Sequence, residues 1–255
     1  MRTIAIVNQK GGVSKTTTAI NLAAGFARSG HRTLLVDLDP QGHATVGLGF
    51  DPETLEGRTV AEALRENAVT LESVIRQTYL PGLEVAPATL SLAATDMALA
   101  SQYYREFRLQ RALQGVTGYE YVLIDCAPTL GTLPVNALVA ASSYLIPAEP
   151  SAYSLRGIGD LLQTIQEVRK MSPGWDYRIL FTKVLARATA VNAIADQSLA
   201  PLREKLLSTR IHRCEALNRS AFAEEPRDIF SADPHCRGAE DYQALTEEVL
   251  VLWPA

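Results

Sequence analysis

Residues 8–18 read NQKGGVSKTTT and directly follow an apolar run, TIAIV, at positions 3–7. A short strand, a glycine-rich turn and the start of a helix form a phosphate-binding loop, because the free N–H groups of the first helical turn point at the bound anion. Gln9 and Ser14 stand where the common pattern G-x-x-x-x-G-K-[ST] has glycine. The loop also carries an additional lysine, Lys10. The stretch therefore predicts a phosphate-binding loop of a variant kind and leaves open what Lys10 does.

Each residue type in the loop has a use in phosphate binding. Gly11 and Gly12 let the backbone approach phosphate oxygens without an intervening side chain. Lys15 is placed to reach the β- and γ-phosphates, and the Thr16 hydroxyl to bind Mg²⁺. If Ser14 requires a positive φ, serine costs roughly 1–2 kcal/mol relative to glycine, which hydrogen bonds to phosphate can offset. We expect the loop to close around a nucleotide through Gly11, Gly12, Val13, Ser14, Lys15, Thr16 and Thr17.

The composition is that of an ordinary globular domain. The chain has 255 residues, 47% hydrophobic and 20% charged, with a formal net charge of −4, so it has no global basic field that would attract nucleic acid. The sequence contains no run of about 18 apolar residues, so it predicts no membrane span. The first predicted strand starts too early to leave room for a signal peptide. We expect a cytoplasmic protein with neither a disulfide framework nor a zinc site, because the cysteines are three and far apart: Cys126, Cys214 and Cys236.

Short apolar runs alternate with longer segments of helical period. YVLID at 121–125 and TLLVD at 33–37 are continuously apolar, as strands buried on both faces are. The pattern predicts strands over 3–8, 32–37, 83–87, 119–125, 143–147, 177–184 and 210–212. It predicts helices over 16–29, 59–67, 90–114, 134–142, 154–171, 190–207 and 239–253, and long loops at 37–58 and 220–238. The alternation predicts an α/β fold, a doubly wound, mostly parallel sheet with helices on both faces.

Carboxylates follow the ends of predicted strands, where ligands bind in parallel sheets. Asp125 ends the strand at 119–125 and is placed to hold Mg²⁺ through water. Asp37 and Asp39 follow the strand at 32–37. Capping of a helix is an alternative role for Asp125. The stretch DLDPQG at 37–42, which contains Asp37 and Asp39, is also typical of an ordinary turn. Together the carboxylates predict a cation site beside the phosphate loop.

Several segments resemble the ParA/MinD family of P-loop ATPases, which have a deviant Walker A loop of the form K-G-G-x-x-K-[ST]. The family most often has glycine where Ser14 stands. The resemblance is to the ParA, or Soj, type of partitioning ATPase and extends nearly from end to end. It rests on KGGVSKTTT at 10–18, LLVDLDPQG at 34–42, YVLIDCAPTLG at 121–131, LIPAEPSAYSLRG at 145–157 and GAEDYQALTEEVL at 238–250.

The resemblance supplies a role for the additional lysine. In this family it reaches across a dimer interface to the phosphates of the other subunit, and Lys10 stands at its position. A lysine from each subunit would neutralise two facing ATP molecules and stabilise charge that develops during hydrolysis. The resemblance further implies that Asp39 orients the attacking water and senses Mg²⁺. We expect Asp37 to cap or position the loop. It implies a catalytic set of Lys10, Lys15 and Asp39.

The resemblance also implies ATP and Mg²⁺ as ligands and slow hydrolysis of ATP to ADP and phosphate. It implies nucleotide contacts from Lys10 and Asp125 besides the loop, and adenine contacts from Thr182, Lys183 and the segment after Ile211. The preference for ATP over GTP comes from the family and not from these residues. The implied ligands of Mg²⁺ are Thr16, Asp39 and Asp125.

The resemblance implies macromolecular partners as well. ParA proteins bind double-stranded DNA without sequence preference when they form homodimers with ATP, and a ParB-like centromere-binding protein stimulates hydrolysis. Arginines in the last third are candidates for phosphate contacts. Glutamates lie among them, so a mixed solvated surface is the alternative. The candidates are Arg187, Arg210, Arg213, Arg219 and Arg237.

A MinD-like ATPase that positions a protein cluster or the division site is the alternative function. A MinD-like membrane anchor needs a basic amphipathic terminal helix, whereas the end of this chain, EDYQALTEEVLVLWPA at 240–255, is acidic, so no membrane partner is expected. An amide ligase of the same superfamily would need a small-substrate pocket, which the sequence does not locate. We expect one P-loop domain over residues 1–255, without an N-terminal helix-turn-helix extension.

Overall fold

The computed structural model contains an eight-stranded sheet in the order β3-β4-β2-β5-β1-β6-β7-β8. Neighbouring strands pair in parallel except β3 and β4, which pair antiparallel. The strands are β1 (Arg2–Ile6), β2 (Thr33–Leu38), β3 (Arg76–Gln77), β4 (Leu83–Ala86), β5 (Tyr121–Cys126), β6 (Ser143–Ala148), β7 (Asp176–Val184) and β8 (Leu206–His212). The structure describes residues 1–55, 57–65, 69–129, 131–170, 174–185, 187, 193–194, 197, 200–220 and 227–255.

Side chains of the central strands alternate between two hydrophobic cores, because successive residues of a strand point to opposite faces. In β2, Leu34 and Val36 pack into one core, and Leu35 between them packs into the other. Ala5 and Ile4 of β1 divide in the same way. All of these side chains are fully buried, so both faces of the sheet need a cover.

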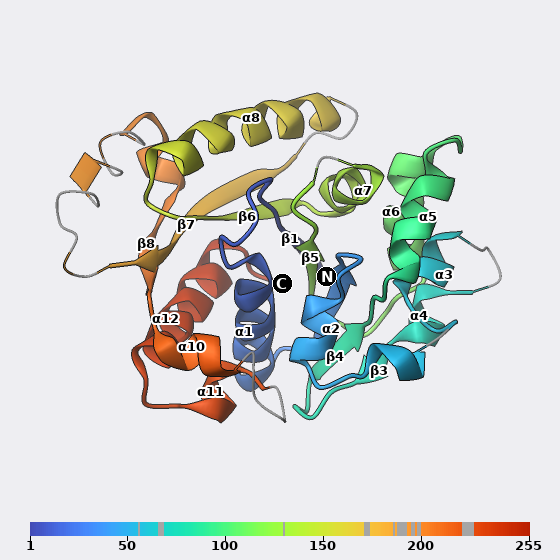
Figure 1. Cartoon of the computed structure of the whole chain (residues 1–255), viewed down its shortest axis with the longest axis horizontal. Helices are drawn as coiled ribbons and strands as arrows, with labels where there is room; N and C mark the ends of the chain where they lie inside the picture. Colours follow the sequence, from blue (N-terminus) through green and yellow to red (C-terminus); the bar gives the residue numbers. More distant parts are fainter. Residues whose placement is uncertain are drawn as a thin grey trace.

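Helices provide that cover on both faces (Figure 1). Helices of the face that holds Leu34 are α3 (Val60–Arg65), α4 (Leu71–Val74), α5 (Ser91–Leu99), α6 (Arg108–Gln114), α7 (Thr132–Ala140) and α8 (Ala152–Arg169). Helices of the opposite face are α1 (Lys15–Arg28), α2 (His43–Gly47), α10 (Glu215–Ser220), α11 (Ile229–Ala232) and α12 (Arg237–Leu252). Short 3₁₀ helices are η1 (Pro52–Leu55), η2 (Arg105–Phe107) and η3 (Ala200–Lys205). The predicted doubly wound fold is confirmed.

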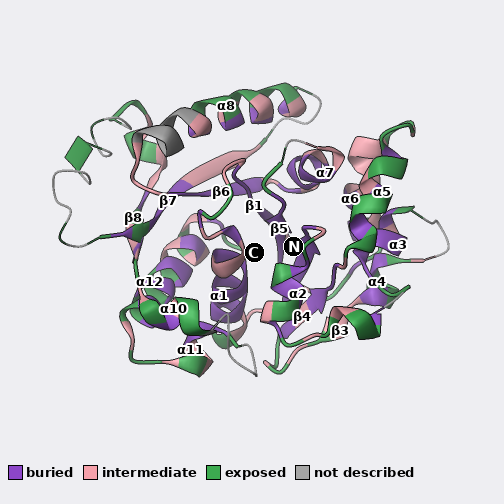
Figure 2. Cartoon of the chain, viewed as in Figure 1, coloured by how far each residue is buried: buried purple, intermediate pink, exposed green. Residues whose placement is uncertain are grey.

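Burial follows this layering. Figure 2 shows buried residues along the strands and α1, and exposed residues on the outer surfaces of the covering helices. Within the described part of the chain, no helix combines the length and the apolar character that crossing a membrane requires.

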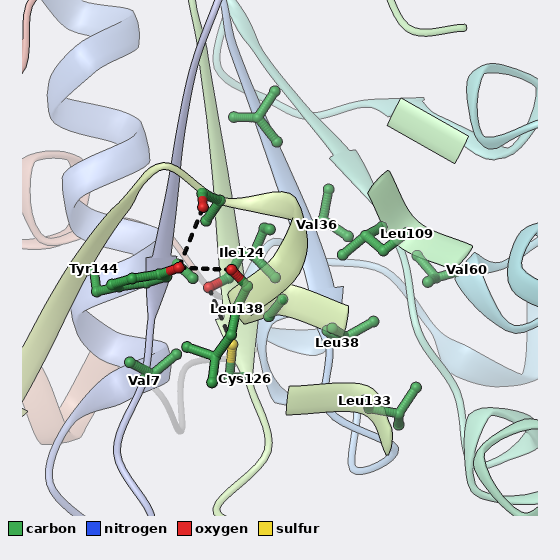
Figure 3. Close-up of a cluster of buried hydrophobic side chains, with 14 of the residues drawn as sticks. Val7, Val36, Leu38, Val60, Leu109, Ile124, Cys126, Leu133, Leu138 and Tyr144 are labelled. Atoms are coloured by element: carbon green, nitrogen blue, oxygen red, sulfur yellow. Dashed lines mark hydrogen bonds between the residues drawn. The ribbon is translucent and has the colours of Figure 1, made fainter. Parts of the chain in front are cut away.

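One of the cores extends to the carboxyl end of β5. Figure 3 shows Tyr144 of β6 beside α7, where its hydroxyl donates to the Leu138 carbonyl oxygen at 2.6 Å. Cys126 lies in the same core and is 2% exposed. Burial raises the pKa of its thiol well above the usual range, and the charge of Asp125 adds to the effect. Cys126 therefore packs as an apolar group beside the site.

Side chains of α12 and of the terminal segment hold β7 and β8 in place. Glu248 of α12 accepts hydrogen bonds from the backbone N–H groups of Ser208 and Thr209 at 2.7 and 2.9 Å. These bonds satisfy amide groups of an edge strand. At the amino end of β7, Asp176 accepts from Trp253 Nε1 at 3.0 Å. The last strands are thus fixed at the end of the sheet away from the phosphate loop.

Two sequence predictions are wrong. The helix predicted over 90–114 is instead α5, η2 and α6. Tyr104 has a φ of 56°, and this left-handed conformation ends the helix in a way that apolar spacing does not reveal. β8 begins at Leu206, so the strand predicted at 210–212 is longer and the helix predicted over 190–207 ends too late.

Short elements were not predicted. The predicted loops at 37–58 and 220–238 contain α2, η1 and α11, and α4, β3 and α10 were also missed, because elements of this length carry little periodicity. Parts of several predictions lie outside the described residues, namely 56, 66–67, 130, 171, 190–192, 195–196, 198–199 and 221–226.

Candidate nucleotide site

The carboxyl ends of β1, β2 and β5 form the floor of the candidate site. β5 lies between the other two, and Asp125 in β5 pairs with Asp37 of β2 and with Ile6 of β1. Because parallel strands end at the same edge of a sheet, the segments that follow them meet there. The phosphate loop leaves β1 at this edge and enters α1, whose first residue is Lys15. The fold thus brings together predicted site residues that lie far apart in the chain.

Neighbouring strands hold the loop. The Asn8 side chain donates to the Pro147 carbonyl oxygen at 2.7 Å and accepts from the Lys10 N–H at 2.9 Å. Thr182 of β7 is fully buried, and its hydroxyl donates to the Val13 carbonyl oxygen at 3.1 Å. Thr182, expected from the resemblance to contact adenine, therefore supports the loop from behind.

The loop backbone is open on its inner side. A Cβ at Gly11 or Gly12 would meet no atom within 4 Å, which leaves room for phosphate oxygens. Gly12 and Ser14 have φ values of 76° and 67°. Ser14 therefore does occupy the left-handed conformation considered from the sequence, at a cost of about 1–2 kcal/mol.

Lys15 points into the site. Its side chain is nearly covered, since the residue is 7% exposed, and Nζ donates to the Lys10 carbonyl oxygen at 3.1 Å. Burial lowers the pKa of Lys15, and the charges of Asp125 and Asp39 act in the opposite direction. A buried cation beside an open amide loop is suited to a phosphate group.

Asp125 is a fully buried carboxyl beside the Thr16 hydroxyl. Both of its oxygens lack a hydrogen bond of acceptable geometry among the described residues. Burial, with the charge of Asp37 next, raises its pKa well above the usual range, and the nearby Thr16 hydroxyl lowers it in part. An unpartnered carboxyl is costly in the interior unless a cation completes it. A carboxylate beside a hydroxyl is also the set of hard oxygen ligands that Mg²⁺ accepts, so Asp125 and Thr16 fit this ion.

The other carboxylates of the floor have different surroundings. Asp37 is fully buried and accepts hydrogen bonds from the N–H and hydroxyl of Thr45 at 2.8 and 2.7 Å. Burial raises the pKa of Asp37 and the Thr45 bonds oppose the rise. Asp37 thus anchors the start of α2, in agreement with its predicted positioning role. Asp39 is 7% exposed, and its Oδ1 accepts from the Gln41 N–H at 3.0 Å. Its charge acts on Lys15, so Asp39 belongs to the floor.

The additional lysine lies on the rim of the site. The Lys10 side chain is 40% exposed, and its Nζ lies 3.6 Å from Glu149 Oε2. Lys183 Nζ lies 3.1 Å from Glu149 Oε1 and also donates to the Gly12 carbonyl oxygen. Glu149, directly after β6, therefore joins the loop to the carboxyl end of β7. The two loop lysines, Lys10 and Lys15, face different surroundings.

A cavity of about 440 Å³ continues from the loop along the ends of β6, β7 and β8. Its size is suited to a nucleoside. Of the two residues predicted to contact the base, Lys183 lines the cavity and Thr182 does not. They are Ser14, Thr17, Glu149, Pro150, Ser151, Lys183, Leu185, Ile211, His212, Arg213, Cys214, Leu217, Asn218 and Tyr242.

The five candidate arginines for DNA lie in different settings. Arg187 and Arg213 are exposed, and Arg213 lines the cavity. Arg210 of β8 lies over the Phe181 ring at 5.4 Å. Arg219 is paired with Asp233 at 3.8 Å, and Arg237 with Asp241 at 2.9 Å. Acidic partners thus offset part of the basic charge.

The sequence did not single out several residues of the site. Glu149 and Asn8 follow strand ends, a position that is itself a signal for ligand contact. Asp241 lies on α12, far from the loop in sequence, and reaches the site only through the packing of α12 against β8. No sequence pattern would have identified it.

Known proteins resemble the chain over almost its whole length. The family model AAA_31, described as an AAA domain, matches residues 1–174. The sporulation initiation inhibitor protein Soj of Bacillus subtilis is 40% identical over 253 residues, which cover 96% of this chain and 97% of that protein. The chromosome partitioning protein ParA of Myxococcus xanthus is 39% identical over 252 residues, which cover 98% of this chain and 88% of that protein.

A solved structure has the same fold with ligands bound. Cobyrinic acid a,c-diamide synthase of Mycobacterium smegmatis, with bound ATP analogue and magnesium, is 32% identical with a TM-score of 0.83, covering 98% of this chain and 94% of that one. An adenine nucleotide and magnesium therefore bind to a closely similar fold.

Proposed function

The chain belongs to the Soj/ParA family of chromosome-partitioning ATPases, and from this premise we propose a specific ATPase cycle for it. The protein binds ATP with Mg²⁺ at the phosphate loop, forms a face-to-face homodimer in that state and binds double-stranded DNA as a dimer. Hydrolysis to ADP and phosphate, stimulated by a ParB-like partner, returns it to the monomer. Repeated cycles on the nucleoid, in the cytoplasm, would segregate a DNA cargo.

Nucleotide binding in this proposal uses the floor and the cavity. The loop N–H groups and Lys15 hold the β- and γ-phosphates, and the nucleoside occupies the cavity beside Ser14 and Thr17. Thr16 and Asp125 would hold Mg²⁺, Asp125 through water. The cation would neutralise the phosphate oxygens and fix their geometry.

Asp39 is the residue we assign to the hydrolytic water. It lies at the surface of the floor with one oxygen anchored by the Gln41 N–H. Such a carboxylate can accept a hydrogen bond from a water and orient it toward the γ-phosphate. Asp37 is already engaged by Thr45 and is less suited to this task.

Dimerisation is supported by the different settings of the two loop lysines. Lys15 already faces the phosphate site of its own chain, with 7% exposure. Lys10 lies on the rim with 40% of its side chain exposed and a long contact, 3.6 Å, to Glu149. A partly exposed ion pair contributes at most about 1 kcal/mol, whereas a triphosphate in a dry interface attracts a lysine much more strongly. Lys10 can therefore exchange Glu149 for the nucleotide of a facing subunit.

DNA binding rests on the exposed Arg187 and Arg213 and on family membership. A dimer doubles the number of these side chains that can face a duplex, so affinity should fall steeply with salt. The ion pairs of Arg219 and Arg237 favour smaller contributions from these two residues.

The alternative proposal keeps the ATPase cycle but replaces DNA with a protein cluster or a division-site component as cargo. The net charge of −4 and the paired arginines are the observations that favour it. A neighbouring gene for a ParB-like protein, with repeated sites, would support partitioning, and its absence would favour the alternative.

Size-exclusion chromatography with light scattering tests the cycle directly. The protein is run with ADP or ATP, each with and without a plain DNA duplex at low salt. A monomer with ADP, a dimer with ATP and a DNA complex with ATP alone are expected. A monomer under every condition would contradict the dimer, and an ATP dimer that ignores DNA would favour the alternative cargo.

A further inference from the structure

His212 stands in the wall of the cavity at the end of β8. The cavity begins at Ser14 and Thr17 beside the phosphate loop and extends to His212, Arg213 and Asn218. A nucleotide whose phosphates occupy the loop must place its base in the part of the cavity farther from the loop. The side chains of that part therefore decide which base fits.

A buried carboxylate fixes the His212 ring. Asp241 Oδ2 accepts from the His212 N–H at 2.7 Å and lies 2.9 Å from Nδ1. The other oxygen, Oδ1, is paired with Arg237 Nε at 2.9 Å, and the Asp241 side chain is 5% exposed. Because an ionised carboxylate only accepts hydrogen bonds, Nδ1 must carry a hydrogen. The contacts of Asp241 thus set the tautomer of the ring.

The opposite nitrogen is directed away from Asp241. His212 is among the residues that line the cavity and Asp241 is not, and Asp241 holds the Nδ1 side of the ring. Within the described part of the chain, no side chain or backbone group hydrogen bonds to Nε2. In the neutral imidazole this nitrogen is an acceptor. The wall therefore presents a hydrogen-bond acceptor of fixed polarity to the base.

Purines differ in what they offer to such an acceptor. Adenine carries a donor, the 6-amino group, where guanine carries an acceptor, O6. We propose that His212 Nε2 accepts a hydrogen bond from the adenine 6-amino group and thereby selects ATP over GTP. This inference rests on the proposed binding of ATP in the cavity. Asp241 is the positioning residue that holds the ring in its accepting form.

Three other polar side chains that line the cavity, Asn218, Tyr242 and Arg213, do not supply this selection. The Asn218 amide can donate or accept, and the Tyr242 hydroxyl is engaged with Thr18 Oγ1 at 3.2 Å. Arg213 only donates and is exposed, so it would favour the O6 atom of guanine. Arg213 would therefore favour GTP, whereas His212 would favour ATP.

The test measures dissociation constants by calorimetry for His212→Phe, which keeps a ring without an acceptor, and for His212→Gln, whose amide presents either polarity. The ligands, each with Mg²⁺, are ATP, GTP and purine riboside triphosphate, which has hydrogen in place of the 6-amino group. The matched control is His31→Phe, because His31 pairs with Glu120 before β2, at the other end of the sheet.

We expect the natural protein to bind ATP roughly three- to tenfold more tightly than purine riboside triphosphate, and about tenfold or more tightly than GTP. In His212→Phe the dissociation constants of the three ligands should lie within about threefold of one another. His212→Gln should lose most of the preference for ATP over GTP, and His31→Phe should keep that preference. An unchanged preference in His212→Phe, or equal binding of the three ligands by the natural protein, would overturn the inference and leave the proposed ATPase in place. Failure of the natural protein to bind any of them would overturn the proposed function as well.

Discussion

The floor and the rim of the site differ in burial and in how their charges are held. The floor consists of Lys15, Asp37, Asp39 and Asp125, none more than 7% exposed. The rim consists of Lys10, Glu149, Lys183 and His212, and the Lys10 and Lys183 side chains are 40% and 46% exposed. Charges interact strongly in a buried setting and weakly at the surface. The floor is therefore suited to fixed chemistry within one chain, and the rim to contacts that change between molecules.

The largest expected effect is on the floor. Lys15→Ala removes the buried cation that faces the phosphates, so we expect ATP binding to weaken at least about 100-fold. Calorimetric titration of ATP with Mg²⁺ measures the change. The matched control is Lys170→Ala, because the Lys170 side chain is 69% exposed and pairs with Glu167 on the surface. Equal ATP affinity in the two variants would place the phosphates elsewhere.

Asp39→Ala separates hydrolysis from binding within the floor. Loss of the residue that orients the water should lower the rate of phosphate release about 100-fold or more, while ATP affinity changes little, because Asp39 does not hold the loop. A phosphate-release assay and a binding titration on the same sample measure both quantities. If ATP affinity falls together with the rate of phosphate release, Asp39 contributes to ATP binding and not specifically to hydrolysis.

The sequence predicted the floor better than the rim, for a physical reason. Lys15, Asp39 and Asp125 follow strands whose buried apolar runs are unmistakable, and parallel strands bring their ends together. The contacts of Glu149 and Asp241 depend on how distant elements pack and leave no periodic signal. The break at Tyr104 between α5 and α6 was also missed, because a single left-handed residue does not alter the spacing of apolar residues.

A change at the far end of the sheet tests the scaffold without touching either region. Burial alone would raise the pKa of Asp176, but hydrogen bonds from Lys205 and Trp253, with the charge of Arg178, hold it at about 2. A carboxyl whose pKa is lower in the folded state stabilises the fold above its unfolded pKa of ~3.9, and the contribution is lost as the pH falls through the folded value. Asp176→Asn should lower the free energy of unfolding by about 1 kcal/mol at neutral pH, after allowance for solvent screening.

Denaturant unfolding between neutral pH and about pH 3 measures this difference, which should shrink as the pH falls. Asp160→Asn is the control, because Asp160 is an exposed residue of α8. ATP affinity should stay unchanged in both variants. A difference that grows toward low pH would have the wrong sign for a carboxyl with a lowered pKa.

The smallest expected effect is on the free energy of unfolding when Ser14, between Lys10 of the rim and Lys15 of the floor, is replaced. Ser14→Gly relieves the left-handed strain but adds backbone freedom to the unfolded chain, so we expect a gain of roughly 0.5–1 kcal/mol in the free energy of unfolding. Gly12→Ala, at a φ of 76°, is the matched change of opposite sign and should destabilise by about 1 kcal/mol. Thermal unfolding without nucleotide measures the melting temperature of each variant. A melting temperature that changes by the same amount and in the same direction in both would show that the left-handed conformation costs no free energy.

The role of the rim is tested most directly by the mass of the ATP-bound protein when Lys10 is removed. Light scattering with ATP compares Asp39→Ala, in which hydrolysis is blocked, with the double variant Lys10→Ala/Asp39→Ala. We predict a dimer for the first and a monomer for the second, with ATP affinities within about threefold, because Lys10 lies outside its own phosphate site. A double variant that still forms the dimer with ATP would contradict the central claim that Lys10 serves the facing subunit.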